Sequence, residues 1–327
     1  MKKIPLGSTD IMLSRMGLGT WAIGGGPAWN GDLDLQVCID TIVEAHRCGI
    51  NLIDTAPGYN FGNSEVIVGQ ALKKLPRKDI VVETKCGIVW ERTGSLFNKV
   101  GDRQLYKNLT PESIREEVDA SLQRLGIESI DIYMTHWQSV EPCFTPIAET
   151  VDTLNALKKE GKIRSIGAAN VDAGHIREYL KHGELDIIQA KYSILDRGLE
   201  AELLPLCQQH GIVVQVYSPL EQGLLTGTIA RDYIPGGARA NKVWFQRENM
   251  LRVIDMLEQW RPLCEKYRCT IPALALAWIL KQSDLITLLS GATAPEQVRE
   301  NVEALTVALT DGDSSLMRQM AEALDIK

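Results

Sequence analysis

Short apolar runs recur along this chain, separated by longer stretches in which apolar residues return every three or four positions. The short runs are typical of strands buried on both faces, and the longer stretches are typical of amphipathic helices. The runs predict strands at 16–19, 51–54, 80–85, 130–136, 163–167, 187–190, 212–217 and 286–290. The longer stretches predict helices at 33–48, 63–74, 110–125, 146–160, 172–182, 198–210, 249–268, 272–281, 295–304 and 313–325. Strands that alternate with helices indicate parallel β/α units.

Eight such units favour an α/β fold of the closed (β/α)8 or TIM-barrel type, with an N-terminal β-hairpin at 3–14 and additional C-terminal helices. The rival is an open doubly wound sheet, which places a Gly-rich dinucleotide-binding turn after its first strand. Gly24-Gly25-Gly26 follows the first strand but lacks the GxGxxG spacing, and no helix starts directly after it. No linker or repeat divides the chain, so residues 1–327 are expected to form one barrel domain with long loops at 86–109 and 219–248.

Composition adds limits on partners and location. The net charge of −7 and the pI of about 5.4 disfavour nucleic acid or an anionic membrane surface as a partner. The first residues lack an apolar signal region, and no run has the length of a membrane span. The seven cysteines are scattered without a CxxC pair, which indicates reduced thiols in a cytoplasmic protein and no metal site. The oligomeric state stays open.

Titratable residues stand at the C-terminal ends of three neighbouring predicted strands. Asp54 ends one strand and Tyr59 lies in the Pro-Gly turn behind it, while Lys85 and His136 end the next two strands. Barrel enzymes carry their active sites at this face, so the four side chains are expected to meet. A nearby cation favours a phenolate, and the set therefore predicts a tyrosine acidic enough to donate a proton near neutral pH. Taken singly, each residue also fits a structural role.

Several motifs follow one another in a familiar order. They are Gly17-Leu-Gly-Thr-Trp21, Asp54-Thr-Ala-Pro-Gly-Tyr59, Gly62-Asn-Ser-Glu65 with Gly69, Lys85, Thr135-His136, Gly167-Ala-Ala-Asn170, Gln189, Tyr217-Ser-Pro-Leu220 with Gly223-Leu-Leu-Thr-Gly227, and Gln297 with Glu300-Asn301. With these motifs the chain resembles the aldo-keto reductases over essentially its whole length. The resemblance implies an NAD(P)H-dependent oxidoreductase that reduces aldehydes or ketones to alcohols. It makes Tyr59 the general acid, has Lys85 and Asp54 lower the pKa of Tyr59, and has His136 orient the carbonyl oxygen.

The resemblance also assigns binding residues. Asn170 and Gln189 are expected to bond the nicotinamide amide, and Tyr217 is expected to stack on the nicotinamide ring. The other expected cofactor-binding residues are Trp21, Ser218, Leu220, Gly223, Leu225, Gly291, Thr293, Gln297 and Asn301. Trp21, Trp29, Trp90 and Trp137 are expected to line the substrate pocket, with loop 86–109 as a wall. Aromatic walls with a polar floor suit small aldehydes, of which methylglyoxal is the example that the family's habits suggest.

The segment Gly291-Ala-Thr-Ala-Pro295 departs from the family pattern. Relatives that prefer the 2′-phosphorylated cofactor usually carry Lys or Arg there, and this segment has no charge. NADH is therefore favoured over NADPH, unless Arg231, Arg239 or Arg299 reaches the phosphate.

Two other functions stay open from the sequence. One is a lyase on the same barrel that uses Lys85 as a Schiff-base nucleophile. The other is a cofactor-sensing regulatory subunit, since some relatives of the family bind potassium channels.

Overall fold

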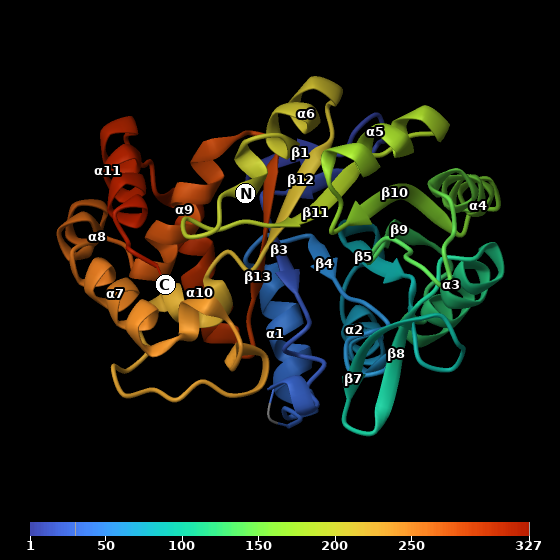
Figure 1. The fold of residues 1–327 in the computed structure, drawn as a ribbon, viewed down its shortest axis with the longest axis horizontal. Coiled ribbons are helices and arrows are strands. Elements are labelled where there is room, and N and C mark those ends of the chain that lie inside the picture. Colours follow the sequence, from blue (N-terminus) through green and yellow to red (C-terminus); the bar gives the residue numbers. More distant parts are fainter. Residues whose placement is uncertain (30, 327) are drawn as a thin grey trace.

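A closed barrel of eight parallel strands forms the centre of the computed structural model, which describes residues 1–29 and 31–326 (Figure 1). Around the barrel the strands follow the order β10-β11-β12-β13-β3-β4-β5-β9. Their bounds are β3 (Met16–Gly19), β4 (Leu52–Asp54), β5 (Val81–Cys86), β9 (Ile130–Thr135), β10 (Ile163–Ala169), β11 (Ile187–Lys191), β12 (Val213–Tyr217) and β13 (Ile286–Gly291). The predicted barrel and its eight strands are confirmed, with shifts of at most about two residues at the strand ends.

Helices surround the barrel (Figure 1). They are α1 (Leu35–Arg47), α2 (Asn63–Leu72), α3 (Pro111–Leu125), α4 (Ile147–Lys159), α5 (Ala173–His182), α6 (Leu203–His210), α7 (Arg247–Glu258), α8 (Arg261–Tyr267), α9 (Ile271–Gln282), α10 (Pro295–Val302) and α11 (Asp311–Glu322). Local sequence sets several of their ends. In α3, the Thr110 hydroxyl accepts from the Ser113 N–H, and Gly126 ends the helix at a φ of 66°.

Two predicted helices are interrupted. The segment 198–210 begins with a single 3-10 turn, and its regular helix α6 starts only at Leu203. The segment 249–268 divides into α7 and α8 around Gln259 and the fully buried Trp260. Pro262 explains the second break, because a proline clashes with the preceding turn and is tolerated only at the start of a helix.

The prediction that residues 86–109 form a loop is wrong. It contains a three-stranded antiparallel sheet made of β6 (Ile88–Val89), β7 (Ser95–Val100) and β8 (Arg103–Lys107). In β7 the residues from Leu96 to Lys99 are all exposed, so the strand lacks the alternation that marks one buried face. The β7–β8 hairpin projects from the barrel on the side opposite to the N-terminal hairpin (Figure 1).

The N-terminal hairpin closes one end of the barrel. It pairs β1 (Lys3–Pro5) with β2 (Met12–Ser14), as predicted. Its buried residues Ile4, Leu6, Ile11 and Leu13 share one apolar cluster with the first inward residues of the barrel strands, including Leu52. Burial of each such side chain stabilises the fold by about 1.5–3 kcal/mol.

Where the structure describes them, the remaining connections contain only short 3-10 turns. Their bounds are Pro27–Trp29, Arg77–Asp79, Gly198–Glu200, Glu221–Thr226, Gly237–Arg239, Val243–Phe245 and Glu303–Thr306. Within residues 1–29 and 31–326, every helix is too short or too polar to span a bilayer.

Candidate active site

Four predicted catalytic residues meet at the C-terminal end of the barrel strands. Asp54 is the last residue of β4, Lys85 lies near the end of β5, and His136 directly follows β9. Tyr59 comes from the turn behind β4, where its N–H bonds the Ala56 carbonyl at 3.1 Å. Lys85 and Asp54 are buried, whereas Tyr59 and His136 are partly exposed at the barrel mouth.

Lys85 links this group. Its ammonium pairs with Asp54 and donates to the Thr55 carbonyl at 3.0 Å and to the Tyr59 hydroxyl oxygen at 3.2 Å. Because the Tyr59 oxygen accepts from Lys85, the tyrosine's own hydrogen is left to donate elsewhere. The His136 ring stands edge-on to Tyr59, with 5.8 Å between ring centroids. The geometry therefore presents one O–H donor and one imidazole to the same space.

The electrostatics keep Lys85 charged and Tyr59 protonated. Burial is the largest single influence on the pKa of Lys85 and lowers it, but the acidic groups around the ammonium, Asp54 first among them, together outweigh burial, and the net shift is upward. Burial and the charge of Asp54 raise the pKa of Tyr59, and the opposing effect of Lys85 does not cancel them. The expectation that Asp54 and Lys85 together lower this pKa is wrong: the net shift is upward, and of the two residues only Lys85 lowers it. A carboxylate disfavours a phenolate, so Asp54 acts on Tyr59 only by holding Lys85.

His136 is neutral. Burial and the charge of Lys85 lower the pKa of its imidazole well below the ordinary value. The ring therefore acts as a hydrogen-bond donor from one nitrogen and not as a charged acid. A protonated Tyr59 and a neutral His136 fit the predicted roles of acid and orienting group, and both roles stay predictions here.

A layer of polar side chains lies directly beneath the ammonium of Lys85. We call Asp54, Glu83, Gln189 and Gln215 the polar layer; they come from β4, β5, β11 and β12. The Gln189 amide nitrogen lies 3.1 Å from Asp54, 2.9 Å from Glu83 and 2.7 Å from the Gln215 oxygen. The Gln215 amide donates to the other Glu83 oxygen at 2.9 Å. The sequence analysis did not predict Glu83 and Gln215 as members of the site. Each is a polar residue inside an otherwise apolar strand, and this was the signal that could have found them.

Asn170 and Tyr217, two predicted nicotinamide contacts, are joined to each other. The Tyr217 hydroxyl donates to the Asn170 side-chain oxygen at 2.8 Å, and the Asn170 amide donates to the His136 carbonyl at 2.9 Å. Gln189 does not join them, because its amide nitrogen is engaged in the polar layer. The nicotinamide contacts of all three residues stay predictions.

The expected pyrophosphate loop has an unusual backbone. Ser218, Glu221 and Gln222 have φ of 54°, 46° and 54°, values that residues other than glycine seldom adopt, and Gly223 follows at 97°. Leu225 is fully buried, while Leu220 is partly buried. Successive amides in such a turn form concavities that favour anions, which fits a phosphate-covering role.

The expected adenosine end lies where β13 leads into α10. Gln297 accepts from the Thr293 N–H at 2.8 Å, and the Asn301 amide lies 3.4 Å from the Gly291 carbonyl. Ala294 gives α10 no side-chain cap. The N-terminus of this helix is therefore not capped by the side chain of the preceding residue, and a helix N-terminus favours an anion.

The three arginines that might serve a 2′-phosphate are already engaged. Arg299 bonds Glu44 at 2.8 Å and Glu296 at 2.6 Å. Arg231 pairs with Asp255, and Arg239 donates to the Gln222 carbonyl and the Tyr233 hydroxyl.

Buried polar atoms without a partner gather around the mouth. In the described part of the chain they include Ser290 Oγ, Gln222 Oε1, His136 Nδ1 and Trp29 Nε1. Such atoms need a ligand or water to offset their burial. They lie near the end of β13, in the loop after β12, after β9 and in the loop after β3, and so fit a group that spans the mouth.

The predicted substrate tryptophans fall into two sets. Trp21 lies 5.1 Å from Trp29 and 6.3 Å from Tyr59, between ring centroids. Trp90 contacts Phe61 at 5.6 Å, and Trp137 packs on Phe97 of β7 at 5.5 Å. The second set therefore ties the three-stranded sheet to the mouth, a role that the predicted loop had not indicated.

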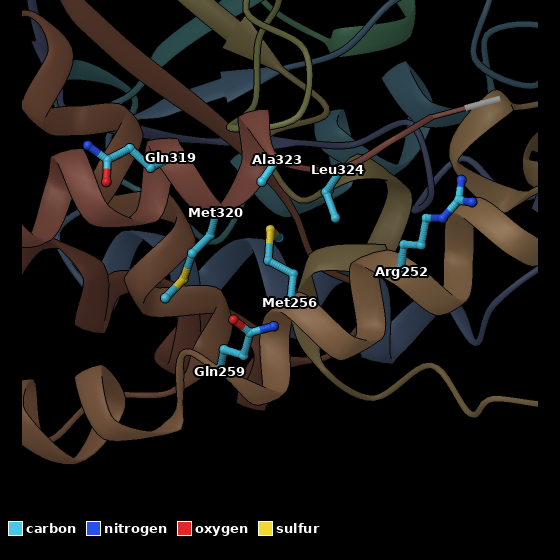
Figure 2. Close-up of a pocket in the computed structure, with 7 residues that line it drawn as sticks. All are labelled: Arg252, Met256, Gln259, Gln319, Met320, Ala323 and Leu324. Atoms are coloured by element: carbon cyan, nitrogen blue, oxygen red, sulfur yellow. The ribbon is translucent and has the colours of Figure 1, made fainter.

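Away from the mouth, a hollow of about 350 Å³ opens between α7 and α11 (Figure 2). Its lining is Arg252, Met256, Gln259, Gln319, Met320, Ala323 and Leu324. It contains no predicted site residue. Among the residues that the structure describes, no group of three or more His, Cys, Asp and Glu is placed to hold a metal ion.

The chain is similar to known proteins along its length. The model of the Aldo/keto reductase family matches residues 15–322. A protein of Escherichia coli called NADH-specific methylglyoxal reductase is 85% identical over 325 residues, which cover 99% of this chain and 100% of that protein. Aldo-keto reductase YhdN of Bacillus subtilis is 34% identical over 98% of this chain and 94% of its own length. The solved glycerol dehydrogenase of Gluconobacter oxydans has a TM-score of 0.87 at 33% identity, covering 99% of this chain and 96% of that one.

Proposed function

The chain belongs to the aldo/keto reductase family and is an NAD(P)H-dependent carbonyl reductase. We propose that it reduces methylglyoxal and similar small aldehydes with NADH, and that Tyr59 is the general acid. The observation that carries the substrate and the cofactor is the 85% identity to a relative named for both. The chain's own residues support the catalytic roles independently.

We assign proton transfer to Tyr59. When bound, a nicotinamide cofactor supplies the hydride, while the protein supplies position and electrostatics. As negative charge grows on the carbonyl oxygen, the Tyr59 O–H donates its proton there, and the neutral His136 ring donates a hydrogen bond to the same oxygen. The Lys85 ammonium, 3.2 Å from the Tyr59 oxygen, then stabilises the phenolate that is left. Asp54 keeps Lys85 in place for this task.

Several features favour NADH as the cofactor. The segment from Gly291 to Pro295 is uncharged, and Arg299 is held between two glutamates. A 2′-phosphate would meet no free cation there, whereas a ribose hydroxyl needs none.

A Schiff-base lyase is disfavoured by the state of Lys85. A nucleophilic lysine must lose its proton, and such lysines have lowered pKa values. The pKa of Lys85 is raised, and its ammonium is engaged by Asp54, Thr55 and Tyr59. A purely regulatory role is also disfavoured, because the chain retains all four catalytic side chains and its relatives are named as reductases.

The decisive experiment is Tyr59→Phe, assayed with NADH and methylglyoxal. Loss of the proton donor should lower kcat by about 10²- to 10⁴-fold, while NADH binding, followed by fluorescence quenching, should persist. Tyr267→Phe is the matched control, since that hydroxyl bonds Asp313 on α11, remote from the barrel mouth. Full activity of the Tyr59 variant would refute the assignment of the acid.

A steady-state comparison of NADH with NADPH across a panel of aldehydes tests the substrate and cofactor separately from the acid. Higher kcat/KM with NADPH, or a marked preference for a bulky ketone, would contradict the proposal. Borohydride trapping with substrate would detect the covalent Lys85 adduct that only the lyase forms.

We further propose that residues 1–327 act as one domain in the cytoplasm. The family match begins at residue 15, and the preceding hairpin packs into the same barrel end through Leu6 and Leu13. All seven cysteines are free thiols, which suits a reducing compartment.

A further inference from the structure

The polar layer is an exception to ordinary barrel packing. Inward positions of a (β/α)8 barrel are usually filled by bulky apolar side chains. Here Asp54 is the register partner of Glu83, and Gln189 is the register partner of Gln215. Both pairs point into the barrel, and Gln189 bonds Asp54 and Glu83 across it. Glu83 is completely buried, yet the catalytic scheme above gives it no task.

When both carboxyls of the polar layer are ionised, the hydrogens of the layer do not cover all of its contacts. The Gln189 amide nitrogen has two hydrogens but lies within hydrogen-bond distance of three oxygens, on Asp54, Glu83 and Gln215. Glu83 also contacts Asp54, and two ionised carboxylates have no hydrogen to share. If Glu83 carries a proton and donates it to Asp54, the contact between the two carboxyls gains a hydrogen, and the two Gln189 hydrogens go to Glu83 and Gln215.

A charge count gives the same answer. Within the described residues, Lys85 is the one cation found in contact with either carboxyl, and it contacts Asp54. A second buried carboxylate would be uncompensated, and closely spaced carboxyls avoid this by holding a proton between them. Burial and the charge of Asp54 raise the pKa of Glu83 well above its usual range, which agrees with the count.

We propose that Glu83 is a positioning residue of the active site: it stands in the barrel as a neutral carboxylic acid whose O–H donates to Asp54, and this bond fixes Asp54 where it pairs with Lys85. The chain of contacts then runs from Glu83 through Asp54 and Lys85 to Tyr59, with one negative and one positive charge in balance. The inference rests on the proposed catalytic roles of Tyr59 and Lys85.

The first test reads the protonation state without using activity. Infrared spectra of the whole enzyme at pH 7 should contain the carbonyl band of buried neutral carboxylic acids, and Glu83→Gln should remove part of it. Glu117→Gln is the matched control, because burial raises the pKa of that carboxyl to about 8 and it bonds the Gly87 N–H, not Asp54. The control should remove a different component and leave kcat unchanged. A band that is the same in the Glu83 variant and the wild type would overturn the proposal.

The second test reads positioning through kinetics. Glu83→Ala should lower kcat by about 10- to 100-fold with little change in KM for NADH, as expected when a supporting hydrogen bond is lost. Glu83→Gln can still donate an N–H to Asp54 and should recover most of that loss. Equal kcat in the alanine variant and the wild type, or no recovery with glutamine, would overturn the positioning role. The proposed function is tested by the loss of activity in Tyr59→Phe. The Glu83 variants can therefore contradict the positioning role without contradicting the proposed function.

Discussion

The two ends of the barrel are built from the same strands but are opposite in chemistry. At the N-terminal end, Leu52, Val81, Ile187 and Val213 face inward and join the hairpin's apolar cluster. Two positions further along the same four strands stand Asp54, Glu83, Gln189 and Gln215, the polar layer. Residues i and i+2 of a strand share one face, so a single step along the barrel interior changes a dry core into a charged site.

The comparison teaches where stability and function reside. The apolar end is stabilised by burial alone and is indifferent to hydrogen-bond geometry. The polar end opposes folding unless every group finds its partner, because buried polar and charged groups are costly when left alone. Its groups are held by Lys85 and by mutual hydrogen bonds, which fix their orientation. A polar layer is thus the less tolerant of the two to change.

Removal of the cation should affect the polar end most. Lys85→Met would leave Asp54 buried without its partner, so we expect a loss of about 3–5 kcal/mol of unfolding free energy as well as of catalysis. Chemical denaturation and kcat measure the two effects. Lys281→Met is the matched control, because that lysine pairs with the exposed Asp311 and should change stability by less than about 1 kcal/mol. Equal stability of the two variants would break the comparison.

Truncation at the apolar end should affect stability alone. Leu52→Ala removes a fully buried side chain from the hairpin cluster and should cost about 2–5 kcal/mol, with kcat per folded molecule retained. Leu316→Ala, at a 40% exposed position, serves as the control and should stay within about 0.5 kcal/mol of the wild type. A fall in kcat without a fall in stability would place Leu52 in the chemistry and contradict the division.

A substitution at the expected adenosine end should have a smaller effect, on the preference between NADH and NADPH. Gln297→Arg places a cation beside the uncharged turn before α10, and one charge-assisted hydrogen bond to a 2′-phosphate contributes about 1.5–3 kcal/mol. The ratio of kcat/KM for NADPH to that for NADH should therefore rise about 10- to 100-fold. Gln319→Arg makes the same change in the hollow between α7 and α11, and an equal rise there would attribute the effect to net charge.

The smallest expected effect is that of pH on reduction. His136 has a lowered pKa and stays neutral as pH falls, and Tyr59 has a raised pKa and stays protonated as pH rises. With both groups in their active forms, kcat for methylglyoxal should be nearly constant from about pH 6 to 8 and should decline only above the usual phenol range near about 10. A transition near about pH 6.5 would show that His136 titrates and that the mouth is wetter than its burial indicates.

Much of the fold and of the candidate site could be predicted from the sequence, because the signals were local. Apolar runs of strand length, helix caps such as Thr110 and Gly126, and the regular alternation of elements were sufficient for the eight-stranded barrel. Asp54, Lys85 and His136 stood at strand ends, and the barrel's topology brings those ends to one face. The three-stranded sheet was missed because β7 lacks a buried face, and the break before α8 was missed because Pro262 was read as part of a continuous helix.

The sequence by itself determined the strand order, the position of the mouth and the four side chains that meet there, since each follows from a residue's place in its own β/α unit. Only the tertiary structure decided that Gln189 turns inward to Asp54 and Glu83, and that Arg299 is held by Glu44 and Glu296. Only the tertiary structure showed that Asp54 raises the pKa of Tyr59. Such facts depend on distances between strands and helices remote in the chain, and electrostatic interactions and hydrogen bonds are decided by those distances.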